Sequence, residues 1–121
     1  MRFMGVLKAD ASSEAGVTPS PELLTRCGQF MEEITRAGVL LATDGLLPSS
    51  KATRVRVTDG KAHVTDGPFA ETKELIASYA IFEVKSRAEA VEWTTRFLKV
   101  LGGGECMIYQ VCEPGSGDAG Q

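Results

Sequence analysis

Basic residues, histidine and paired cysteines are scarce in this chain of 121 residues, and each shortage excludes a class of function. Thirteen lysines and arginines stand against sixteen aspartates and glutamates without a basic cluster, whereas nucleic-acid binding usually needs a basic stripe. A single histidine and three cysteines without metal-type spacing argue against zinc. No phosphate-loop or dinucleotide motif occurs. We therefore expect no cofactor, no metal and no direct contact with nucleic acid.

Long apolar runs are missing as well. No window reaches the roughly 20 apolar residues that cross a bilayer, and residues 1–4 lead straight into a short strand rather than into a signal peptide. The three cysteines are odd in number, and Cys106 and Cys112 share one predicted strand, roughly 20 Å apart and too far for a disulfide. These features predict reduced thiols in a cytoplasmic protein without membrane contact.

Apolar alternation and apolar runs predict six strands, at residues 3–8, 39–43, 51–58, 61–65, 75–84 and 106–111. The first helix is predicted to begin after Ser20, because a capping hydroxyl precedes a proline, and to end before Gly38. The second begins at Ser86 with a capping box and runs to about residue 100. Asp59-Gly60 predicts a tight hairpin between the third and fourth strands.

The order of these elements predicts an α+β fold. It matches the ferredoxin-like split βαβ plan with an inserted β-hairpin. A chain of this length forms one domain, which we place at residues 1–113. Residues 114–121 are rich in glycine and serine and are predicted to form a flexible C-terminal tail.

The strand at residues 75–84 is apolar on both faces. Its two alternating sets are Ile76, Ala80, Phe82 and Val84 on one side and Leu75, Ala77, Tyr79 and Ile81 on the other. Two helices cover only one face of an antiparallel sheet, and large apolar patches are rarely left in water. We therefore predict a homodimer in which two sheets pack face to face.

Residues 66–74 read DGPFAETKE. Aspartate, glycine and proline are typical of a turn, and an aromatic residue, charged residues and an apolar strand follow. This run resembles the signature of the DGPF-domain branch of the YCII-related family, and the resemblance covers residues 1–113. It implies a dimeric α+β barrel. Much of that family has no assigned reaction.

The density of polar groups in the signature favours some role in binding. We interpret Asp66 and Glu74 as catalytic groups that transfer a proton or anchor the ligand, since neighbouring carboxylates raise each other's pKa. Phe69, Glu71 and Lys73 are interpreted as substrate-binding residues. The alternative is a rigid turn that delivers the chain into the next strand, with Phe69 as its anchor.

Two further residues are candidates for a site. Lys8 ends the first strand and is interpreted as a substrate-binding residue that holds an anionic ligand or pairs with a signature carboxylate. Its alternative is extension into solvent. His63 is the only histidine, and strand alternation turns it away from Asp66, which predicts an exposed strand residue.

The chain departs from the enzymes that it resembles. Some YCII-related proteins are thought to use a His–Asp pair, with the histidine on the first helix and the aspartate after the second. Cys27 stands near the place of that histidine, and residues 101–105 read LGGGE, without the aspartate. A reaction that depends on the pair is therefore not expected, and Cys27 is interpreted as a buried helix cysteine.

Two functions remain open. The first is binding or conversion of a small polar or anionic molecule in a dimer cleft, without a cofactor. The second is a regulatory or protein-interaction module linked to an extracytoplasmic-function sigma factor pathway, which the family resemblance suggests. An acidic surface suits protein contact better than DNA contact.

Overall fold

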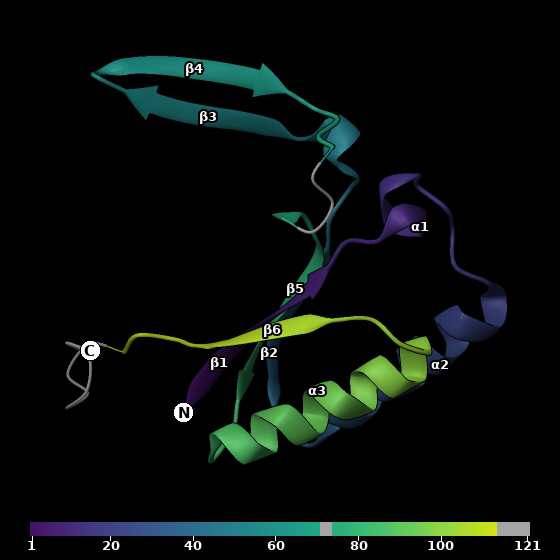
Figure 1. The fold of residues 1–121 in the computed structure, drawn as a ribbon. Coiled ribbons are helices and arrows are strands. Elements are labelled where there is room, and N and C mark those ends of the chain that lie inside the picture. The colour runs from purple at the N-terminus through teal and green to yellow at the C-terminus, as the bar shows by residue number, and fades with distance from the viewer. Residues whose placement is uncertain (71–73, 114–121) are drawn as a thin grey trace.

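A computed structural model describes residues 1–70 and 74–113 (Figure 1). Glu71, Lys73 and the tail at residues 114–121 lie outside the described residues. The strands are β1 (Arg2–Lys8), β2 (Leu40–Gly45), β3 (Thr53–Thr58), β4 (Lys61–Asp66), β5 (Ile76–Glu83) and β6 (Cys106–Gln110). The helices are α1 (Ala11–Glu14), α2 (Pro21–Arg36) and α3 (Arg87–Leu101), with a 3-10 turn, η1, at Ser49–Lys51. The sequence predicted every strand but neither α1 nor η1.

The helix ends follow their capping residues. The Ser20 side chain accepts a hydrogen bond from the Leu23 N–H at the start of α2, and Gly38 has a φ of 75° just beyond its end, so both predicted caps are confirmed. Ser86 likewise caps α3. The predicted capping box there is only half formed, because the Glu89 carboxylate accepts from the Lys85 N–H.

The main sheet has four antiparallel strands in the order β2-β5-β1-β6. One β-α-β unit consists of β1, α2 and β2, and the other of β5, α3 and β6. In each unit the two strands are separated by a strand of the other unit, so the two units interleave. This is the split βαβ arrangement, and the mixed α+β architecture expected from the sequence is confirmed. β3 and β4 form the inserted hairpin as a separate two-stranded sheet. Its turn has positive φ at both Asp59 (53°) and Gly60 (76°), as a tight two-residue hairpin requires.

The core lies between the four-stranded sheet and helices α2 and α3, which cover one of its faces (Figure 1). Phe3 and Phe82, opposite each other on β1 and β5, pack in one cluster with Phe30 of α2. The Phe30 ring meets Trp93 and Phe97 of α3 at centroid distances of 6.1 and 6.0 Å. Burial of these aromatic groups fixes the two helices on the sheet.

The other face of the sheet is apolar too and carries no helix. Residues opposite each other in an antiparallel ladder share a face. The ladder therefore places six residues on this open face: Met4, Val6, Tyr79, Ile81, Met107 and Tyr109. Met107 and Tyr109 on the edge strand β6 are 41% and 53% exposed. Both faces of β5 are thus apolar, as its sequence predicted, while only one is covered within the described chain.

The β3–β4 hairpin leaves the end of the sheet at which β2 stops and β5 begins. It stands away from the sheet, on the side opposite α2 and α3 (Figure 1). Every residue of β3 and β4 is exposed, and the two strands contact each other far more than any other element.

Candidate functional site

A groove of about 860 Å³ opens at the end of β1. Its walls come from the last residues of β1, the segment that leads to α2, the first turn of α2 and the segment after α3. Lys8 and Asp10 enter from one side, and Gly104 and Glu105 from the other. The volume is in the range of small-molecule sites, which span about 300–1,000 Å³.

Backbone hydrogen bonds fix Lys8 in this groove. The Lys8 N–H donates to the Glu105 carbonyl at 2.9 Å, and the Ala9 N–H donates to the Leu75 carbonyl at 2.9 Å. The first bond ties β1 to the segment after α3, and the second ties it to the start of β5. Lys8 therefore stands on a rigid strand end, and its side chain is half-buried.

Charged groups of both signs line the groove, with Lys8 set against the carboxylates of Asp10 and Glu105, so the lining suits a polar ligand. Lys8 is the only basic residue among the described residues that line it. The Asp10 carboxylate accepts from the Ser13 N–H at 2.8 Å as the cap of α1, so its charge is partly engaged. The first turn of α2, at Ser20, adds backbone N–H groups at the positive end of a helix dipole.

The signature residues Asp66 and Phe69 lie at the base of the hairpin. Asp66 accepts a hydrogen bond from the Thr53 hydroxyl at 3.0 Å, across the β3–β4 ladder. The Gly67 N–H donates to the Ala52 carbonyl at 2.9 Å, and the following Gly67–Pro68 peptide is cis. The Arg54 guanidinium lies 4.3 Å from the centroid of the Phe69 ring. These contacts join the signature to the first strand of the hairpin.

Ser49 is the centre of a buried polar contact that sequence reasoning missed. It is 4% exposed, and its hydroxyl donates to Glu14 while accepting the Phe69 N–H at 2.9 Å. The Ser49 N–H also donates to the Glu14 carboxylate at 2.9 Å. Glu14 on α1, Ser49 on η1 and Phe69 in the signature thus form one network. No local pattern signals it, because its members are 20 and 35 residues apart.

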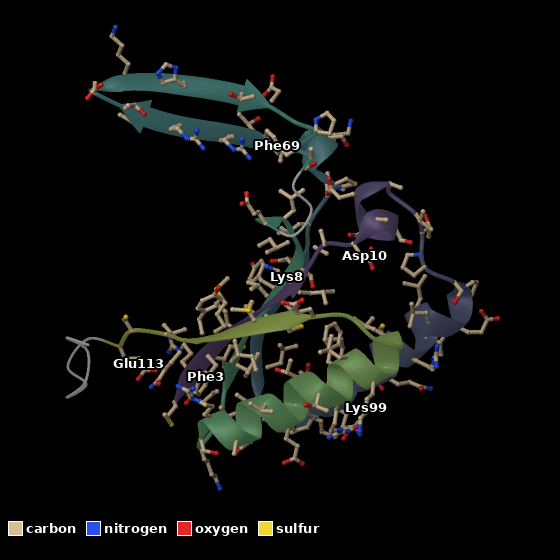
Figure 2. The ribbon with its side chains drawn as sticks, in the orientation of Figure 1. Phe3, Lys8, Asp10, Phe69, Lys99 and Glu113 are labelled. Carbon is tan, nitrogen blue, oxygen red and sulfur yellow. The ribbon has the colours of Figure 1, made fainter. Side chains whose placement is uncertain are left out.

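The structure brings only some of the expected site residues together. Lys8 lines the groove, and Glu74 directly precedes Leu75, the residue that bonds to the strand end beside Lys8. Asp66 and Phe69 do not line this groove. Figure 2 shows Phe69 beside the hairpin and Lys8 with Asp10 below it. The roles of Asp66 and Glu74 in catalysis, and of Phe69 in substrate binding, stay predictions, and Glu71 and Lys73 lie outside the described residues.

A second space lies inside the molecule, between α2, α3 and the sheet. It is apolar and measures only about 50 Å³, with Phe30, Trp93, Phe97 and Cys106 among its lining residues. That volume holds a few waters at most, because one water needs about 10–15 Å³. Burial raises the pKa of the Cys106 thiol, which disfavours a reactive thiolate there. The groove is therefore the better candidate site.

The remaining titratable groups give no catalytic cluster. His63 is exposed on β4, as predicted, and Cys27 is half-buried rather than buried. Within residues 1–70 and 74–113, no three histidine, cysteine or carboxylate side chains gather as metal ligands. None of the helices in this part of the chain has both the length and the apolar character to span a bilayer.

One polar pair stands on the open sheet face. The Tyr79 hydroxyl donates to the Asp44 carboxylate at 2.7 Å. This hydrogen bond, together with the negative charge of Asp44, raises the pKa of Tyr79 above its ordinary value of 10.0. The raised pKa contributes stability that is complete below pH 10 and is lost as the pH rises through the folded-state value.

Asp44→Asn is expected to lower the pKa of Tyr79 towards 10.0, because the charge that opposes phenolate formation is removed. The tyrosinate absorbance during an alkaline titration measures this change. Tyr79→Phe identifies which transition belongs to Tyr79. An unchanged titration in Asp44→Asn would show that the pair does not persist in solution.

Comparison with known proteins identifies the family. The model of the YCII-related domain matches residues 1–113. A comparison with curated proteins finds no match. Among solved structures, the chain is similar to 5-chloro-2-hydroxyhydroquinone dehydrochlorinase (TftG) from Burkholderia phenoliruptrix AC1100 in complex with 2,5-dihydroxybenzoquinone, with a TM-score of 0.51 and 13% identity. The match covers 92% of this chain and 93% of that one, and at this identity it shows a shared fold. On the strength of the family match, the chain belongs to the YCII-related domain family.

Proposed function

We propose that this protein binds or converts a small polar or anionic molecule in the groove at the end of β1. The observation that carries the proposal is Lys8, held on a rigid strand end inside a groove of about 860 Å³. A lysine in the wall of such a groove attracts and orients a negative group. We propose that this needs no cofactor and that Glu74, next to this strand end, assists as a carboxylate.

The fold neighbour suggests a probe. Its structure holds 2,5-dihydroxybenzoquinone, an acidic hydroxyquinone, and a compound of that class fits a groove whose single lining cation is Lys8. We further propose, from residues 66–74, that the chain belongs to the DGPF branch of its family. The sigma-factor alternative has no specific contact in its favour among the described residues and stays a prediction, as does a cytoplasmic location.

Lys8→Ala is expected to weaken binding of 2,5-dihydroxybenzoquinone at least about tenfold, because a hydrogen bond to a charged group contributes about 1.5–3 kcal/mol. Titration calorimetry measures the affinity. Lys99→Ala is the matched control, since Lys99 lies on α3 away from Lys8 (Figure 2) and outside the groove lining. Equal loss in both variants, or no binding to the unaltered protein at any concentration tested, contradicts the proposal for this class of ligand.

We also propose that the protein is a homodimer whose open sheet faces pack together. Six apolar or aromatic side chains line that face, and α2 and α3 lie on the other one. A second copy of the same chain presents the same apolar surface, which is the self-complementarity that a two-fold interface requires. Tyr109→Glu, at a 53% exposed position on the edge strand of this face, is expected to break such a dimer, which sedimentation measures.

A further inference from the structure

The β3–β4 hairpin has two chemically different sides. Because opposed residues share a side, the ladder sets Val55 with Val64 and Val57 with Ala62 on one side. The same ladder sets Arg54 with Thr65 and Arg56 with His63 on the other side, which is basic. One side is therefore an apolar strip, and the other carries positive charge.

Nothing in the described chain covers the apolar strip. Val55, Val57 and Val64 are 65%, 66% and 65% exposed, and β3 and β4 make few contacts outside the hairpin. An isolated two-stranded hairpin is marginally stable in water. Because three valines of this hairpin are exposed to water, we expect a surface outside the described chain to pack against them and stabilise the hairpin.

The base of the hairpin is anchored, so its direction is defined. Thr53 bonds to Asp66, Ala52 bonds to Gly67, and the buried Ser49 bonds to Phe69 on the incoming segment. These bonds tie both ends of the hairpin to η1 and α1. The arm therefore projects from the body on the side of the open sheet face, away from α2 and α3 (Figure 1).

We propose that the hairpin is an arm that grips a second copy of this chain, with the Val55–Val57–Val64 side packed on that copy beside the contact between the two open sheet faces. This inference rests on the homodimer proposed above and adds a second contact surface to it. The open sheet face and the valine side of the hairpin are both uncovered and lie on the same side of the molecule. A two-fold pair of chains buries both surfaces. Each copy then holds the other with its own arm.

Area supports a second copy as the occupant, because the chain itself presents a second uncovered apolar surface on the same side as the hairpin. A stable interface buries about 800 Å² on each partner, whereas the largest apolar patch on a monomer is usually about 300–600 Å². An interface that includes both the sheet face and the arm reaches about 800 Å² per partner more readily than an interface made by either surface alone.

The test compares the two sides of the hairpin. Val55→Asp on β3 and Val64→Asp on β4 together place two charges on the apolar strip, and Thr65→Asp on β4 places one charge on the basic side as a control. All three positions are exposed, so the fold itself should be unaffected. Sedimentation of the full chain over a range of concentrations measures the dimer dissociation constant, and circular dichroism checks folding.

We expect Val55→Asp/Val64→Asp to raise the dimer dissociation constant at least about 100-fold, since buried valines contribute strongly to association. Thr65→Asp should change it less than about threefold. A dimeric unaltered protein with unchanged association in the double variant overturns the arm and leaves the homodimer standing. Equal disruption by Thr65→Asp overturns the assignment of the apolar side. A monomeric unaltered protein overturns the dimer and the arm together, while ligand binding in the groove is measured independently by calorimetry.

Discussion

Gly67→Ala is expected to lower the free energy of unfolding by about 3 kcal/mol, the upper end of overpacking effects. A Cβ atom at this position would lie 1.7 Å from the Ser49 carbonyl oxygen and 2.8 Å from its carbonyl carbon. Both are backbone atoms, so no flexible side chain can move aside. Ser49 is also held by Glu14, which means that displacing it disturbs α1 and η1 as well.

The glycine of the signature is therefore explained by close approach of two backbones. Urea unfolding measures the loss in stability, and limited proteolysis of residues 46–70 reports whether the hairpin base has loosened. Gly28→Ala is the matched control, because nothing lies within 4 Å of a Cβ there and the site is an exposed position within α2. That substitution is expected to stabilise the protein by up to about 1 kcal/mol. Similar unfolding midpoints for Gly67→Ala and the unaltered protein would contradict the packing.

Local signals predicted the elements of this fold well. Ser20 before Pro21 caps α2, Ser86 caps α3, and Asp59-Gly60 turns the hairpin with positive φ at both residues. Each of these features depends on residues within four positions of one another, which sequence reasoning can inspect directly. The apolar open face was also foreseen, because both alternating sets of β5 are visible in the sequence. The short α1 was missed, since four polar and small residues carry no apolar period.

The candidate site was harder to predict, for a physical reason. In a sequence, a carboxylate that ends a strand beside a turn looks the same as one that faces a ligand. The structure shows Asp66 bonded to Thr53 and Phe69 bonded to Ser49, and these are contacts across 13 and 20 residues. Lys8 was singled out because a charge ended an apolar strand, and the structure places it in the groove. The other walls of the groove come from distant segments that no local pattern joins.

The polar network around Ser49 gives the second large expected effect. Ser49→Ala should lower the free energy of unfolding by about 1–3 kcal/mol, because it removes the partner of the Phe69 N–H and one donor to Glu14. Glu14→Ala should cost a similar amount, since the Ser49 N–H and hydroxyl both lose their acceptor. Urea unfolding of the two single variants and the double variant measures both costs and their coupling.

The double variant decides whether this network acts as a unit. If it does, the loss in Glu14→Ala/Ser49→Ala is smaller than the two single losses added together, by about 0.5–3 kcal/mol. Ser50→Ala is the control, because Ser50 is the exposed neighbour of Ser49 on the same turn and should change stability by less than about 0.5 kcal/mol. Purely additive losses would mean that Ser49 and Glu14 stabilise the fold independently and not as a unit.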